Sequence, residues 1–299
     1  MNLPDPVMYA VPAFVVAMVA EAALSRKLDR SMYEIGDTST SLLLGFGHLI
    51  SAALFGWVFY GVLSFVYRFH LLNIGVSWLS FLAAFVAYDF CYYWGHRYEH
   101  EIRLGWAAHM AHHSSQHFNF ASALRQPWID VFTAIGWLPT LLMPLIGFTP
   151  ELTLFTIGTS LIYAFFSHTE FVRRLWASVE YVLVTPSHHR VHHAVNPRYL
   201  DANYGNTFIL WDRWFGTFVG EDDAEPCRYG LVHNVGTFNP ARIALGELIS
   251  MGKDVRRSPS LRAALGYIFG PPGYSHDGSR RTSAMIRVAA GLKADRKEK

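Results

Sequence analysis

The chain has 299 residues, of which 52% are hydrophobic and only 16% are charged. Soluble domains usually carry about a quarter of charged residues, so this composition indicates a membrane-embedded protein with a polar part. The formal net charge of +2 is too small to favour a nucleic-acid-binding protein, and two cysteines do not make a disulfide framework.

Uncharged or nearly uncharged runs of suitable length predict the membrane-spanning segments. An apolar run of about 20 residues crosses the hydrocarbon core of a bilayer as a helix. The fourth run contains Pro139 and Pro144, so it also allows a kink or a re-entrant shape. In chain order, the five runs are residues 7–24, 41–67, 76–94, 128–148 and 152–167. The sequence therefore predicts an all-α integral membrane protein with four or five transmembrane helices.

Basic residues after the first run predict the orientation in the membrane. Arg26, Lys27 and Arg30 place the loop after this run on the cytoplasmic side. Five crossings then put residues 95–127, and everything after Ser167, on the same side. We therefore expect a histidine-rich helical cap on the cytoplasmic face of a bacterial inner membrane or of the endoplasmic reticulum.

Nine histidines form three tight clusters and one outlier, all next to apolar runs. Imidazole is the commonest metal ligand among side chains, and residues three or four apart share one face of a helix. Two of the clusters repeat the same HxxHH spacing. Nine donors exceed what one tetrahedral zinc ion can use, so we expect two metal ions. The expected ligands are His96, His100, His109, His112, His113, His168, His189, His192 and His193.

Other metal-binding proteins have signatures that this sequence lacks. It contains no HExxH box and no CxxC pair, so a zinc protease, a structural zinc site and an iron–sulfur cluster are not predicted. Carboxylates are sparse near the clusters, so neutral imidazoles would hold the ions, and such ligands suit iron, zinc or copper alike. A membrane metal-handling protein, either a transporter or a sensor, stays open as an alternative at this point.

Polar residues near the clusters are candidates for catalysis or for orienting the ligands. Asp89 precedes His96 by seven residues, so on a helix it faces the same way, and an acid inside a membrane span is usually functional. Glu101 and Asn203 complete the set that we expect to be catalytic. Metal-bound imidazoles usually donate their second N–H to a carboxylate or a carbonyl. Further candidates for that supporting role are Glu99, Glu170, His188, Asp201 and Asp212.

The histidine clusters belong to a longer series of motifs. Between Tyr88 and Phe218 the chain contains, in order, DFCYYWGHRYEH, HMAHHSS, HHRVHH, NYG and WDRWFGTF. This series resembles the fatty acid hydroxylase/sterol desaturase superfamily. Within that superfamily, the chain resembles the alkylglycerol monooxygenase group in the segments LVTPSHHRVHHAVNPRYLDANYG and YGLVHNVGTFNP.

The resemblance implies that the nine histidines hold two iron ions, with zinc able to occupy the site in preparations. It also implies that O2 and an external reductant are used to hydroxylate or desaturate a C–H bond of a lipid. In the alkylglycerol monooxygenase group, the electrons come from tetrahydrobiopterin and the carbon beside the ether oxygen is hydroxylated. Other members act on sterols or fatty-acyl lipids with a protein electron carrier, which is the alternative for this chain.

The resemblance also implies a domain organisation and a set of partners. Residues 1–75 would form N-terminal membrane helices, residues 76–240 a fatty acid hydroxylase-type catalytic domain, and residues 241–299 a cytoplasmic or interfacial tail. The expected partners are the membrane, a lipid substrate, O2 and an external electron donor, with no nucleic acid.

Overall fold

The computed structural model describes residues 3–133 and 135–294. In this part of the chain the regular structure is helical, apart from two isolated β-bridges that join Leu183 to Phe208 and Ala194 to Tyr229. The prediction of an all-α protein is confirmed for these residues.

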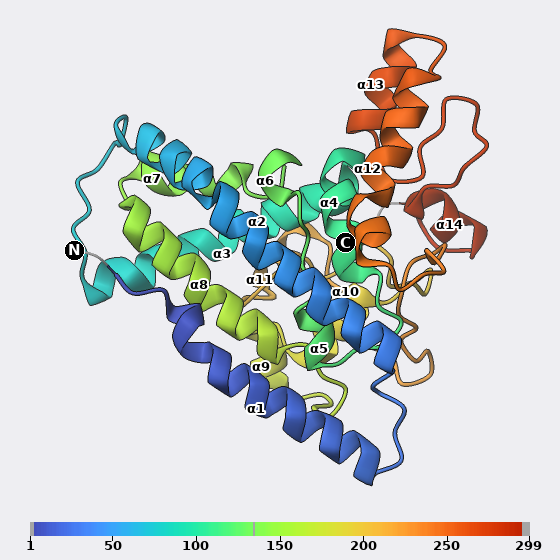
Figure 1. Cartoon of the computed structure of the whole chain (residues 1–299), viewed down its shortest axis with the longest axis horizontal. Coiled ribbons are helices and arrows are strands. Elements are labelled where there is room, and N and C mark those ends of the chain that lie inside the picture. Colours follow the sequence, from blue (N-terminus) through green and yellow to red (C-terminus); the bar gives the residue numbers. More distant parts are fainter. Residues whose placement is uncertain (1–2, 134, 295–299) are drawn as a thin grey trace.

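Two long apolar helices, α1 (Pro6–Lys27) and α2 (Ile35–Tyr67), form one side of the molecule together with α8 (Pro150–Phe166) (Figure 1). Both α1 and α2 contact α8. Large apolar side chains on α1 and α2 face outward, for example Val16 at 68% exposure and Trp57 at 72%. Both helices are long and apolar enough to cross a membrane, which together with this exposure indicates a membrane protein.

The predicted third and fifth runs also form helices. The third, α3 (Trp78–Glu101), begins at a capping box made by Ser77 and Ser80 and continues through His96 and His100. The fifth run corresponds to the 17-residue α8. A buried apolar cluster joins α3 to α8 and to the segment before α8; its members are Ala84, Tyr88, Cys91, Met143, Phe148 and Leu152.

The predicted fourth run, residues 128–148, does not form one helix. It divides into α6 (Asp130–Thr133), the 3-10 helix η1 (Leu138–Leu141) and α7 (Leu142–Ile146), while Ala134 lies outside the described residues. Pro139 and Pro144 interrupt backbone hydrogen bonding, and Gly147 ends α7 with a φ of 129°. The number of four or five crossings is therefore not confirmed, since two described helices, α1 and α2, have the length and hydropathy of a span.

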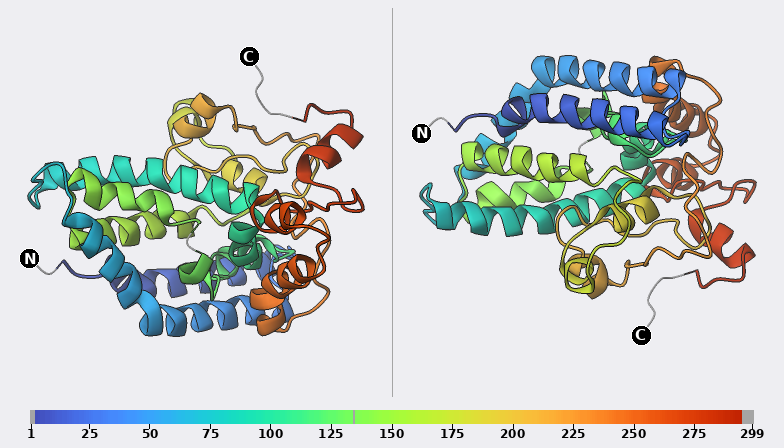
Figure 2. Two further views of the ribbon diagram at one scale, coloured as in Figure 1. Left: turned by 90° about the horizontal axis from the view of Figure 1, so that it is seen from above. Right: turned by 90° about the horizontal axis from the view of Figure 1, so that it is seen from below.

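The remaining short helices lie around the carboxyl-terminal half of α3 (Figure 2). Those rich in histidine are α4 (Arg103–His113), which packs on α3, and α10 (Pro186–His193). Three further short helices complete this region; they are α5 (Phe120–Ala123), α9 (Ala177–Val182) and α11 (Leu210–Phe215).

The C-terminal region packs against the histidine-bearing helix α4. It contains α12 (Pro240–Arg256), α13 (Leu261–Phe269) and α14 (Ser283–Ala289), and α12 packs along α4. The buried Arg103 of α4 joins the two layers, because its guanidinium donates to Glu247 at 2.6 Å and to Asp254 at 2.7 Å. Residues 295–299 of this region lie outside the described residues.

Candidate metal centre

All nine predicted histidines come together in two groups. Within each group, the nitrogen atoms that could bind a metal all lie within 4.8 Å of one another, and every one of these side chains is buried. The first group contains His96, His100, His109, His113 and His192. The second group contains His112, His168, His189 and His193. The two groups are adjacent, since the rings of His113 and His193 stack with centroids 4.2 Å apart.

Helical spacing explains how α4 contributes to both groups. His109 and His113 are four residues apart, so they share a face of α4 and enter the first group. His112 points in another direction and enters the second group, with its ring at 89° to that of His113. The consecutive histidines at the end of the HxxHH motif are thus divided between the two groups.

The helix α10 repeats this division with the opposite weighting. His189 and His193 share a face and enter the second group, whereas His192 enters the first. The isolated His168, just after α8, closes the second group: its Nε2 lies 3.0 Å from Nε2 of His189 and 3.3 Å from Nε2 of His112.

Four of the ring nitrogens that face away from the groups contact backbone carbonyls. Because a carbonyl oxygen can only accept, each contact places the ring proton on Nδ1 and leaves the lone pair of Nε2 facing the group. Four Nδ1 atoms lie 2.8 to 3.1 Å from such an oxygen: His96 from Tyr204, His112 from Arg125, His168 from Ala164 and His192 from Ala202.

The inward-facing nitrogens fit metal ions. Nε2 of His109 lies 3.0 Å from Nε2 of both His96 and His113, a spacing at which two lone pairs repel unless a proton or a cation lies between them. Nε2 of His100 and Nε2 of His192 are buried without a hydrogen-bond partner among the described residues. Buried nitrogen atoms that accept no hydrogen bond are stabilised by a bound ion. Each group supplies enough nitrogen ligands for one metal ion.

Burial also favours the protonation state that binds a metal. It lowers the pKa of His168 to about 4. It lowers the pKa values of His112, His189 and His193 well below their usual range, and the neighbouring imidazoles add to this effect. At neutral pH these rings are therefore uncharged and keep the lone pair that ligation requires.

Asp89 is buried, as the sequence analysis anticipated, but its carboxylate does not support His96. It accepts hydrogen bonds from the backbone N–H groups of Thr207 and Phe208 at 2.8 and 3.0 Å, and from the indole of Trp211 at 2.9 Å. Its oxygens are thus committed to the segment that leads into α11. These contacts are those of a positioning residue, and a catalytic role for Asp89 stays a prediction.

Glu101 and Asn203 also lie outside the two groups. The side chain of Glu101 is 42% exposed and pairs with Arg97 at 2.8 Å. Asn203 is buried with a φ of 56°; its side-chain amide donates to the carbonyls of His188 and Val219, and its oxygen accepts from the N–H of Val219. Asn203 therefore joins α10 to a neighbouring loop, and catalysis by either residue stays a prediction.

Two of the further candidates do lie beside the histidines of the first group. Glu99 Oε2 is 3.1 Å from Nδ1 of His109, and Asp201 Oδ1 is 3.8 Å from Nδ1 of His100. A carboxylate on the outer nitrogen of a ligating ring fixes its orientation and raises its basicity.

Asp212 acts on the first group through the backbone. It accepts from the N–H groups of Tyr204 and Gly205 at 2.7 and 2.8 Å, and the carbonyl of Tyr204 holds His96. Burial raises the pKa of Asp212 to about 6, which these hydrogen bonds oppose.

An ion pair that no motif of the sequence indicated supports the second group. Arg125, whose carbonyl meets His112, donates from its guanidinium to Asp37 of α2 at 2.8 Å. Ser115 donates to the other oxygen of that carboxylate at 2.5 Å. A charged residue at the start of the apolar α2 is the only sequence signal for this contact, since its partner lies 88 residues away.

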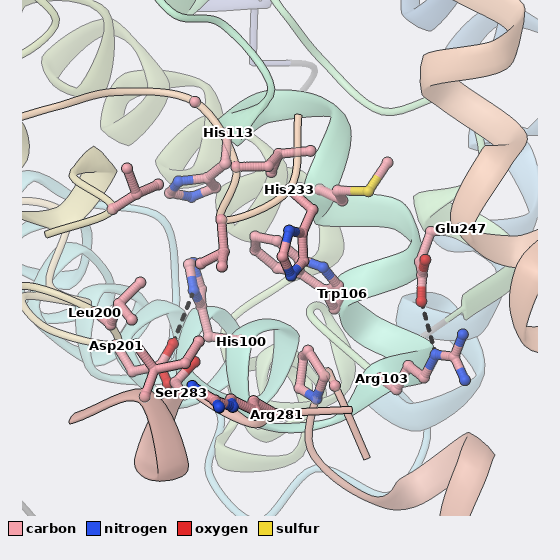
Figure 3. Close-up of a pocket in the computed structure, with 18 of the residues that line it drawn as sticks. His100, Arg103, Trp106, His113, Leu200, Asp201, His233, Glu247, Arg281 and Ser283 are labelled. Carbon is pink, nitrogen blue, oxygen red and sulfur yellow. Dashed lines mark hydrogen bonds and ion pairs between the residues drawn. The ribbon is translucent and has the colours of Figure 1, made fainter. Parts of the chain in front are cut away.

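A cavity of about 470 Å³ adjoins the first group (Figure 3). His100 and His113 line it together with Ser283 of α14, and Glu247 of α12 lies across the cavity from these histidines. Trp106 also lines it, with its ring centroid 5.3 Å from that of His100. The wall is mixed in character, so a small molecule with polar and apolar parts can reach the histidines from this side.

Comparison with known proteins adds an independent finding. Residues 81–217 match the family model of fatty acid hydroxylases. Alkylglycerol monooxygenase of Xenopus tropicalis is 35% identical over 284 residues, which are 91% of this chain and 60% of that protein. The Homo sapiens alkylglycerol monooxygenase is 34% identical over 281 residues, which are 91% of this chain and 61% of that protein.

A more distant relative also bears a lipid-related name. The ornithine lipid hydroxylase of Rhizobium tropici is 27% identical over 132 residues, which are 44% of this chain and 39% of that protein. The chain spans about 60% of the length of the first two relatives. No solved structure matches it.

Proposed function

Because residues 81–217 match the family model of fatty acid hydroxylases, we propose that the chain is a membrane-bound, metal-dependent lipid monooxygenase. The proposed substrates are alkylglycerols, as the names of the relatives with 34 and 35% identity suggest. We propose hydroxylation at the carbon beside the ether oxygen, which is what the resemblance of the motifs implies. The observation that carries this proposal is the convergence of nine buried histidines in two adjacent groups.

The proposed cofactor is a pair of iron ions, one for each histidine group. Imidazole donors suit iron, zinc and copper, but zinc has no redox chemistry and so cannot serve a monooxygenase by itself. When bound, the iron pair would supply the activation of O2 and the electron transfer that C–H hydroxylation needs. The carbonyls of Tyr204, Arg125, Ala164 and Ala202 hold four of the rings in the ligating tautomer.

The chain itself would bring the substrate to the metals and exclude water. The burial of all nine histidines gives the dry surroundings that protect a reactive oxidant from side reactions. The exposed apolar surfaces of α1 and α2 place the protein in the bilayer from which a lipid is taken. Arg26, Lys27 and Arg30, at the end of α1 that leads to the site, favour a cytoplasmic position for the metals.

The reaction needs an external reductant. Insertion of one oxygen atom of O2 into a C–H bond, with the other leaving as water, consumes two electrons and two protons. We assign their supply to tetrahydrobiopterin, with a protein electron carrier as the alternative. The product of an alkylglycerol would be a hemiacetal, which breaks into an aldehyde and glycerol.

The test is turnover by the purified, iron-loaded protein in lipid nanodiscs. An alkylglycerol, a sterol and a fatty-acyl lipid are each supplied with tetrahydrobiopterin or with a ferredoxin system, and products are identified by mass spectrometry. We expect aldehyde from the alkylglycerol with the pterin. Hydroxylated or desaturated products from the other lipids would instead indicate the sterol or fatty-acyl alternative.

Two ligand variants connect this activity to the histidines. His192→Ala, in the first group, and His112→Ala, in the second, should each abolish turnover and lower the iron content. His70→Ala is the matched control, because His70 stacks on Tyr67 just after α2, outside both groups. Full activity and full iron in both ligand variants would refute the proposal, and metal flux without O2 consumption would favour a metal-handling protein.

A further inference from the structure

Helix α13 has an exposed apolar face. Leu261, Leu265 and Phe269 follow one another at four-residue spacing, so they lie along one face, and they are 76%, 45% and 56% exposed. Ala263 and Tyr267, on the opposite side, are buried. A row of three large apolar side chains is more than the scattered exposure that is normal on a soluble surface.

Basic residues surround the tip at which α12 turns into α13. Lys253, Arg256, Arg257 and Arg262 are all exposed there. The neighbouring acid, Asp254, is already paired with Arg103 at 2.7 Å and with Arg280 at 2.6 Å. The tip therefore presents net positive charge next to an apolar face.

The pair α12–α13, residues 240–269, stands out from the rest of the molecule (Figure 1). Its base is fixed to the N-terminal part of α2. The hydroxyl of Thr40 donates to the carbonyl of Phe238 at 2.9 Å, and Leu44 packs with Ile243 and Ala244. The pair thus leaves the molecule at the end of α2 that lies near the histidine-bearing helices.

We propose that α13 lies in the interface of the membrane that α1 and α2 enter. Leu261, Leu265 and Phe269 would face the acyl chains, and the four basic residues of the tip would contact anionic lipid headgroups. A helix with an apolar face and flanking basic residues binds a membrane surface through buried apolar area and electrostatic attraction. The inference rests on the chain being a membrane protein, and it does not require the oxygenase activity.

Such an anchor would also fix the position of the cavity beside the first histidine group. Glu247 and Ser250 of α12 line this cavity, and Arg103 joins α12 to α4. With α13 in the interface, the cavity lies close to the headgroup region. A lipid could then reach the cavity without its apolar chain crossing water.

The test places an environment-sensitive fluorophore on α13 of the full chain. Cys91 and Cys227 are replaced by Ala, Leu265→Cys is labelled with a nitrobenzoxadiazole probe, and the protein is reconstituted in vesicles of phosphatidylcholine and phosphatidylglycerol. The reference for contact with acyl chains is Val16→Cys on α1, and the reference for water is Ser279→Cys in an exposed loop.

We expect blue-shifted emission at position 265, with quenching by lipids that carry a spin label near the headgroup. The label at 279 should keep water-like emission, and the spin-labelled lipids should not quench it. Quenching at 265 should weaken when phosphatidylglycerol is omitted or when Arg256 and Arg257 are both replaced by Glu. The probe reads membrane contact alone, so its result does not depend on the oxygenase proposal.

Two results would overturn the inference. One is water-like emission at 265 in both vesicle compositions while the label at 16 shows blue-shifted emission. The other is shielding at 265 that rises with the ratio of protein to lipid and ignores the spin-labelled lipids, because a second copy of the chain would then cover α13.

Discussion

The rings of the first histidine group differ in what holds their outer nitrogen. His96 and His192 contact backbone carbonyls, whereas Nδ1 of His109 meets the carboxylate of Glu99 at 3.1 Å. An anionic acceptor makes the Nε2 of the ring a stronger donor to a metal than a carbonyl does. His109 also lies between His96 and His113, so the support given by Glu99 affects the centre of the group.

Glu99→Gln should therefore weaken metal binding in the first group. The amide keeps the shape of the side chain but removes its charge, and loss of such a supporting carboxylate lowers metal affinity about 10–100-fold. Titration against a competing chelator measures the change. Glu151→Gln is the matched control, because Glu151 lies at the start of α8 and accepts a hydrogen bond from the hydroxyl of Tyr60 on α2. Equal affinities in the two variants would contradict the role given to Glu99.

The HxxHH spacing predicted six of the nine histidines that gather, but not which acid supports them. Glu99 and Glu101 are two residues apart on α3, so they point to different sides of the helix. One meets His109 and the other pairs with Arg97 at the surface. The choice depends on where α4 packs against α3, which no local pattern encodes. The same reason explains Asp89, whose partners lie 118 to 122 residues away.

At the scale of helices and segments, the ligands on α3 depend on a close approach of two backbones. A Cβ atom on Gly95, next to His96, would lie 1.9 Å from the carbonyl oxygen of Gly136. One on Gly136 would lie 2.0 Å from Oε1 of Glu99. Two glycines thus allow the segment between α6 and η1 to pack on α3 directly below the first histidine group.

Gly95→Ala should lower both the stability and the metal content of the protein. The obstructing atom belongs to the backbone, so α3 must shift, and overpacking of this kind costs about 1–3 kcal/mol. Thermal unfolding in nanodiscs and metal analysis measure the two effects. Gly56→Ala on α2 is the control, because a Cβ there meets nothing within 4 Å. A Gly95→Ala protein with an unchanged melting temperature and full metal would contradict this account.

Three apolar runs predicted the bounds of α1, α2 and α8 well, but the fourth run, residues 128–148, does not form one helix. Runs 7–24 and 41–67 lie within α1 and α2, and run 152–167 matches α8 to within two residues. Run 128–148 is equally apolar but contains two prolines, and it folds as short pieces against α2 and α3. Hydropathy reports burial in an apolar environment, which neighbouring helices provide as well as a bilayer does.

At the scale of the whole molecule, the two histidine groups join segments that are distant in the chain. Their members come from α3, α4, the end of α8, and α10. Between these segments and the outside lie the long apolar helices on one side and α12 to α14 on the other (Figure 2). Metal ions bound at the groups would therefore hold the histidine-bearing segments together, and their binding free energy would add to the stability of the fold.

Removal of the metals should accordingly lower the melting temperature, and addition of Fe²⁺ or Zn²⁺ should restore it. Without cations, neutral rings remain with their nitrogen atoms as close as 3.0 Å, as for Nε2 of His168 and Nε2 of His189.

Acid should destabilise this metal-free protein further. The pKa of His168 falls from an ordinary 6.5 to about 4 on folding. Below pH 6.5 the unfolded chain therefore binds protons first, and the free energy of unfolding decreases down to about pH 4.

Melting curves of the metal-free and reloaded protein across this pH range measure both effects. The His70→Ala protein should behave as the unmodified chain does, because His70 lies outside both groups. His193→Ala removes one ring from the second group. This variant should therefore lose less stability than the unmodified chain when the metals are chelated, and regain less when they are added back. A melting temperature that chelation leaves unchanged in all three proteins would mean that the histidines are packed as an ordinary core. Metal ions that join four segments must contribute to the free energy of unfolding.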